Sequence, residues 1–130
     1  MRSDAREAAF RIVFADLFCG DGEKNFRAAV YRQAKLNEED TAFAERIVSA
    51  VLAHKEELSK EIAETVTRFA DYRIYPADKA AMLVALSEIR YMDDIPPVVS
   101  VSEATSIARK YSTEKSADFV NGVLGGIINK

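Results

Sequence analysis

The sequence has few of the residues that most catalytic and metal sites use. Its 130 residues include one cysteine, one histidine and no tryptophan. Cys19 alone cannot form an internal disulfide, and His54 alone would need partners that the sequence does not supply for a zinc site or a histidine-containing triad. No P-loop and no G-x-G-x-x-G pattern is present either. The sequence therefore predicts a protein that is not an enzyme and uses no metal or cofactor.

The chain also lacks a strong net charge and long apolar runs. Its formal net charge is −3, so it has no broad attraction to nucleic acid, and any RNA-binding role must use a local basic patch. No apolar run approaches the roughly 18 residues of a membrane span. The amino end is charged and shows no cleavage pattern of a secretory signal. We expect a cytoplasmic protein.

Strand signals are scarce, and glycine and proline are few. The only short β-branched run, Val98–Val101, directly precedes a helical pattern and has no partner strand. Five glycines, three prolines and 48% hydrophobic residues describe a globular chain. Near this length, folding hides roughly two-thirds of the surface that an unfolded chain exposes. The sequence predicts one all-α domain over residues 1–130.

Amphipathic stripes predict about seven helices, arranged as two small helical bundles that share the fifth helix. The apolar phase changes near His54, which predicts a bend or break between the third and fourth helices. Pro76 fits the first turn of the fifth helix, which is apolar all round and should run through the centre. The S-x-x-E capping box at Ser100–Glu103 predicts the start of the sixth helix.

The first predicted helix, over about residues 3–18, is apolar on two sides. Phe10, Phe14 and Phe18 follow one stripe, and a second stripe lies beside them. Such a helix is either buried twice or offers one side to a partner. Arg2 and Arg6 share a face near its start, and arginine suits phosphate and base contacts because its planar fork donates in pairs and stacks on rings.

The last predicted helix carries an Asn-Gly pair on its polar side. Phe119, Val120 and Val123 begin its apolar stripe, while Asn121 and Gly122 interrupt the opposite side. Glycine costs about 1 kcal/mol relative to alanine inside a helix. The pair therefore indicates a close approach by another element, either a neighbouring helix or a bound partner.

Four short motifs occur in order along the chain: Ala5–Ala9, Asp78–Ala80, Asp94–Pro96 followed by Val101–Ala104, and Phe119–Leu124. Their identity and spacing resemble the NusB family of bacterial transcription antitermination factors. The resemblance implies a fold of two helical subdomains. It also implies binding to boxA RNA together with NusE, a small-subunit ribosomal protein. The complex then joins the RNA polymerase elongation complex, notably in ribosomal RNA transcription.

The resemblance also implies two sets of site residues. The RNA contacts fall on Arg2, Arg6, Lys115, Phe119, Asn121 and Gly122. The NusE contacts fall on Phe14 and Asp78. Phe119 would stack on a base or pack behind the stacking surface. The family often has consecutive arginines at its amino end, whereas this chain has fewer, which predicts weaker RNA binding by the protein alone.

Two other functions stay open at this point. One is the NusB-like RNA-binding module that precedes the catalytic domain of certain ribosomal RNA cytosine methyltransferases. The other is a helical scaffold that binds protein only, which the negative net charge would permit. A homodimer also stays open, because a helix that is apolar on two sides can serve a second copy as well as NusE.

Overall fold

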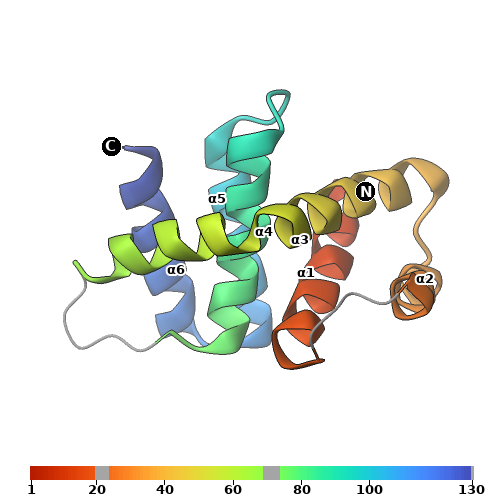
Figure 1. Cartoon of the computed structure of the whole chain (residues 1–130), viewed down its shortest axis with the longest axis horizontal. Coiled ribbons are helices and arrows are strands. Elements are labelled where there is room, and N and C mark those ends of the chain that lie inside the picture. Colours follow the sequence, from red (N-terminus) through yellow and green to blue (C-terminus); the bar gives the residue numbers. More distant parts are fainter. Residues whose placement is uncertain (20–23, 69–73, 130) are drawn as a thin grey trace.

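The computed structural model describes residues 1–19, 24–68 and 74–129. The chain forms six α-helices within these residues and no strand (Figure 1). They are α1 (Arg2–Cys19), α2 (Lys24–Gln33), α3 (Glu38–Val66), α4 (Pro76–Tyr91), α5 (Pro97–Tyr111) and α6 (Glu114–Ile128). The predicted fold class is confirmed. The predicted number of helices was one too high, because the third and fourth predicted helices are a single kinked element.

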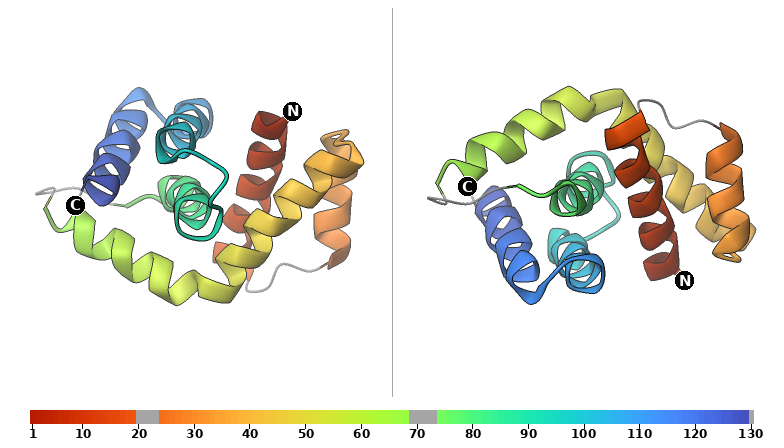
Figure 2. Two further views of the ribbon diagram at one scale, coloured as in Figure 1. Left: turned by 90° about the horizontal axis from the view of Figure 1, so that it is seen from above. Right: turned by 90° about the horizontal axis from the view of Figure 1, so that it is seen from below.

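The kink in α3 lies at His54, where the sequence pattern changes phase. His54 has φ −122° and ψ 21°, outside the helical region, although the helix continues on both sides. Its imidazole ring stacks on the ring of Tyr91 at the end of α4, with centroids 4.1 Å apart and planes 16° from parallel. The kink lets the first half of α3 pack beside α1 while the second half extends toward α6 (Figure 2).

Helix α4 lies at the centre of the fold, as its uniform apolar character predicts. It packs against α1, α3, α5 and α6 (Figure 2). Its residues from Ala80 to Glu88 are all buried, with Met82, Leu83 and Leu86 fully inside. Helices α5 and α6 complete the group on one side of α4, and α1, α2 and the first half of α3 form the group on the other side.

Helix α5 begins four residues earlier than its capping box predicted, which placed the N-cap at Ser100. Pro96 is the N-cap, and the β-branched run Val98–Val101 is helical. Ser100 and Glu103 make contacts with other helices instead of capping α5, because Ser100 donates to Glu88 and Glu103 accepts hydrogen bonds from α1. Both side chains therefore bind residues of other helices and do not form the local cap that the S-x-x-E pattern indicates.

Both apolar stripes of α1 contact the rest of the domain for most of their length. Ala5, Ala9, Ile12 and Val13 are buried on one side, and Phe10 is buried on the other. Toward the end of the helix the phenylalanine stripe becomes exposed, since Phe14 is half-buried and Phe18 is 64% exposed. Internal packing thus accounts for the start of α1, and an aromatic surface at its end stays exposed among the described residues.

Candidate RNA-binding and partner-binding surfaces

Arg6 lies inside the protein, at the junction of α1, α4 and α5. Its side chain is about 4% exposed and faces two carboxylates. The guanidinium donates to both carboxylate oxygens of Glu88, with N–O distances of 2.9 Å, and to Glu103 at 3.2 Å. Ser100 Oγ donates a further hydrogen bond to Glu88 at 3.1 Å. The predicted direct contact of Arg6 with RNA does not fit this position, since its donors already serve internal partners.

Arg2 is exposed at the start of α1. Its guanidinium lies 3.6 Å from the Asp94 carboxylate in the α4–α5 connection, and both side chains are about half exposed. The same group sits 4.4 Å from the centroid of the Phe43 ring, a cation–π contact that holds it against the surface. Arg2 is therefore oriented and remains accessible, as a phosphate-contacting group should be.

The other predicted RNA residues gather around the start of α6. Thr113 caps this helix by accepting a hydrogen bond from the Ser116 backbone N–H at 2.9 Å. Lys115 in the first turn is exposed, and no ion pair or hydrogen bond of its side chain occurs within the described part of the chain. Phe119 is buried to 5% exposure, so it packs behind the surface and does not present a ring for stacking.

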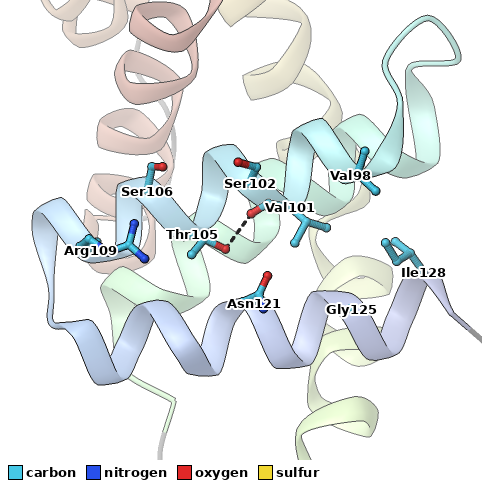
Figure 3. A pocket seen from close by; sticks show the side chains of 9 residues that line it. All are labelled: Val98, Val101, Ser102, Thr105, Ser106, Arg109, Asn121, Gly125 and Ile128. Atoms are coloured by element: carbon cyan, nitrogen blue, oxygen red, sulfur yellow. Dashed lines mark hydrogen bonds between the residues drawn. The ribbon is translucent and has the colours of Figure 1, made fainter.

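Asn121 is exposed and lines a groove between α5 and α6 (Figure 3). The groove has a volume of about 430 Å³, and its other lining side chains include Thr105, Arg109 and Ile128. Gly122, the next residue, is half-buried. The Asn-Gly pair therefore faces outward along the α5–α6 pair, and the prediction that it permits a close approach stays a prediction.

The two groups of predicted RNA residues lie at opposite ends of one face. Contacts between α1 and α5 define this face: Ser3 donates to Glu103 at 2.6 Å, and Lys110 donates to Glu7 at 2.7 Å. Arg2 lies near the start of α5, and Lys115 lies beyond its end. A helix of fifteen residues is about 22 Å long. The predicted residues thus share one face but form an extended track rather than a single spot, and their contact with RNA stays a prediction.

Asp78, one of the two predicted NusE contacts, is completely buried in the first turn of α4. Its Oδ2 accepts a hydrogen bond from Ser116 Oγ at 3.0 Å, and Ser116 pairs in turn with Ser112 at 2.8 Å. This chain of hydrogen bonds joins α4 to the start of α6. A direct contact between Asp78 and a partner does not fit such burial, so the structure gives Asp78 an internal role.

Burial also raises the pKa of Asp78, against the smaller opposing effects of its serine hydrogen bonds. Because the folded-state pKa lies above the unfolded value of 3.8, Asp78 contributes most to stability below that pH, and the contribution is lost as pH rises through the folded pKa. We expect Asp78→Asn to gain stability relative to the unmodified protein as pH rises from 4 to 7. Urea midpoints at several pH values measure this difference. If Asp78→Asn instead loses stability relative to the unmodified protein as pH rises from 4 to 7, the assignment is wrong.

Phe14, the other predicted partner contact, lies in the aromatic stripe of α1, and an apolar hollow lies beside the end of this stripe. Phe14 is half-buried between Phe10 and Phe18, whose ring centroids lie 5.9 and 5.1 Å from its own. The hollow has a volume of about 360 Å³ and is lined by Leu17, Phe18, Ser59, Ile62, Ala63, Ile74, Pro76 and Lys79. The aromatic stripe of α1 was visible in the sequence, but the walls come from α3 and the start of α4, which only the fold brings together.

The described residues hold no group of three or more histidine, cysteine or acidic side chains that could bind a metal ion. Among the helices searched, none is long and apolar enough to cross a membrane. The fold and its surfaces thus define a small all-helical protein with an exposed basic and polar face and a separate apolar hollow.

Comparison with known proteins agrees with this description. The NusB family model matches residues 3–129, and the chain belongs to the NusB family. A transcription antitermination protein NusB from Methylacidiphilum infernorum is 35% identical over 109 residues, which cover 84% of this chain and 76% of that protein.

Two solved structures share the fold. The solution structure of NusB from Aquifex aeolicus superposes with a TM-score of 0.80 at 25% identity, covering 98% of this chain and 87% of the other. A crystal structure of the antitermination factors NusB and NusE in complex with double-stranded RNA matches with a TM-score of 0.85 at 22% identity, covering 97% of this chain and 94% of the other.

Proposed function

We propose that this protein is a transcription antitermination factor that binds boxA RNA together with NusE and joins the RNA polymerase elongation complex in the cytoplasm, notably during ribosomal RNA transcription. Membership of the NusB family over residues 3–129 carries the proposal, because curated members of the family are named for transcription antitermination. The matched fold of a NusB bound to NusE and RNA supports the same function.

The proposed RNA surface is the face formed by α1, α5 and the start of α6. Arg2 and Lys115 are its exposed cations at the two ends, and Asn121 adds an amide beside the groove. Arg6 and Phe119 support this face from below, because both side chains are buried. So few free cations imply modest affinity for the protein alone, and NusE would supply the remaining contacts.

A titration of labelled boxA RNA, with and without NusE, tests the proposal. We expect the protein to bind the RNA and NusE to tighten the complex, as measured by fluorescence anisotropy. No binding under either condition would instead favour the protein-only scaffold.

Lys115→Ala is expected to weaken RNA binding roughly fivefold at 0.1 M salt and to reduce the salt slope by about 0.7, because one phosphate contact to a single strand is lost. Lys60→Ala is the matched control, since Lys60 is an exposed lysine on α3, which lies across α4 from α5 (Figure 2). Equal affinities for the two variants would remove Lys115 from the RNA surface.

A further inference from the structure

One exposed aromatic ring lies between the two basic ends of the proposed RNA surface. Tyr111 is the last residue of α5 and is 41% exposed, which leaves a substantial part of its ring open to solvent. Its other side packs on Phe10, a core residue of α1, with ring centroids 4.9 Å apart and planes inclined by 40°. The ring is therefore fixed by the core and remains accessible from outside.

Charged side chains of both signs lie around this ring. The Lys110 ammonium lies 5.6 Å from the Tyr111 ring centroid. Arg109 precedes it at the end of α5 and forms an ion pair with Glu114 at 2.8 Å. Lys115 follows four residues later, and its side chain has no ion pair within the described residues. Arg11, on the adjacent turns of α1, is close enough to lower the pKa of the phenol. Burial first, and the neighbouring Glu7 second, outweigh these cations and raise that pKa, so the ring stays neutral at pH 7.

A neutral aromatic ring with cations nearby can contact both an unpaired base and a phosphate of single-stranded RNA. Base stacking on aromatic side chains and phosphate contacts with lysine and arginine together account for most recognition of single strands. A docking surface for a protein would present a contiguous apolar patch, as the hollow beside Phe18 does. Tyr111 stands instead among charged side chains of both signs, namely Lys110, Arg109 and Arg11 together with the carboxylates Glu7 and Glu114.

Resting on the proposed RNA-binding function, we propose that Tyr111 is the stacking platform for an unpaired base of the bound RNA, with Lys110 as the adjacent phosphate contact. This places a base-contacting residue on the track of about 22 Å that separates Arg2 from Lys115. Neither residue belongs to the motifs from which the site was predicted. The Phe10 ring beneath Tyr111 gives the platform its rigidity.

In the free protein, Glu7 occupies the Lys110 ammonium that we propose as the phosphate contact. The Lys110 ammonium donates to Glu7 Oε1 at 2.7 Å, and this contact raises the pKa of Lys110. Both side chains are partly exposed, so the pair can open at small cost when a phosphate competes for the ammonium. Removing the carboxylate should leave Lys110 available and remove one negative charge from the RNA track.

Three variants test the proposal with the same labelled boxA RNA. Tyr111→Phe should bind as the unmodified protein does, since the stacking surface is kept. Tyr111→Leu retains an apolar contact with Phe10 but no ring, and it should bind roughly tenfold more weakly. Glu7→Gln should bind roughly fivefold more tightly at 0.1 M salt, because one more cation is free for a phosphate. Thermal melts followed by circular dichroism check that each variant is folded.

A base analogue separates stacking from a merely structural effect. RNA carrying 2-aminopurine at successive positions should lose fluorescence at one position when it binds the unmodified protein or Tyr111→Phe, and not when it binds folded Tyr111→Leu. If Tyr111→Leu binds the RNA as tightly as the unmodified protein does, the inference is wrong while the proposed function stands. If Tyr111→Leu weakens NusE binding and leaves RNA binding unchanged, the ring is a protein contact and the inference is again wrong. If the unmodified protein binds no RNA with or without NusE, the proposed function itself fails.

Discussion

Arg6→Met is expected to lower the free energy of unfolding by about 3–5 kcal/mol, because it leaves the buried Glu88 carboxylate without its counter-charge. Glu88 is completely buried, and its two oxygens face Arg6 Nε at 2.9 Å. After the substitution, Ser100 is the only described residue whose side chain still donates to Glu88. Chemical denaturation with urea, at constant pH and salt, measures the loss.

A double variant and a surface control make this prediction specific. Arg6→Met combined with Glu88→Leu should recover most of the lost stability, since an apolar pair of similar volume often replaces a buried ion pair without cost. Arg2→Met should change stability by no more than about 0.5 kcal/mol, because its pair with Asp94 is half exposed. A double variant as unstable as Arg6→Met alone would show that the loss does not come from the unpaired charge.

The same double variant tests whether Arg6 touches RNA. Because Arg6 is buried beneath the proposed RNA surface, the folded double variant should keep its RNA affinity. Loss of one phosphate contact would instead weaken binding roughly fivefold at 0.1 M salt. A loss of that size in a fully folded protein would restore Arg6 to the RNA surface.

The sequence predicted those features of the fold that depend on periodic apolar patterns. The uniformly apolar stretch of α4 and the change of phase near His54 translate directly into a central helix and a kinked α3. Apolar periodicity reports which side of a helix is buried, and the number and order of helices follow from it. The sequence predicted two separate helices on either side of His54, whereas the chain forms one kinked helix. A change of apolar phase does not distinguish a kink from a break.

The side-chain roles at the site could not be predicted to the same degree. Arg6 and Asp78 are charged, and charged residues are rarely fully buried unless they are paired. Their partners lie far along the chain: Glu88 is 82 residues from Arg6, and Ser116 is 38 residues from Asp78. The capping pattern at Ser100 and Glu103 gave a wrong helix start for the same reason, because a local pattern says nothing of hydrogen-bond partners on other helices. The family motifs include Arg6, Asp78 and Glu103 without saying which of these side chains face solvent.

Phe18→Ala is expected to weaken binding of NusE about 30-fold or more, because a large exposed aromatic beside a hollow is the typical anchor of a protein interface. Phe18 is 64% exposed, and its ring packs edge-on against Phe14 at 5.1 Å. The hollow beside it has apolar walls from Leu17, Ile62 and Ile74. Isothermal titration calorimetry with purified NusE measures the change in affinity.

A matched control and an independent readout distinguish this contact from a general loss of structure. Phe26→Ala removes another exposed phenylalanine, 42% accessible, from α2 at the far end of the molecule (Figure 1), and it should leave NusE affinity unchanged. Phe18→Ala should unfold at the same urea concentration as the unmodified protein, since most of the ring is already in water. It should also bind boxA RNA normally in the absence of NusE, because the proposed RNA surface lies along α5. If NusE binds Phe18→Ala and Phe26→Ala equally well, the apolar hollow is not the NusE surface, and the half-buried Phe14 loses its proposed role with it.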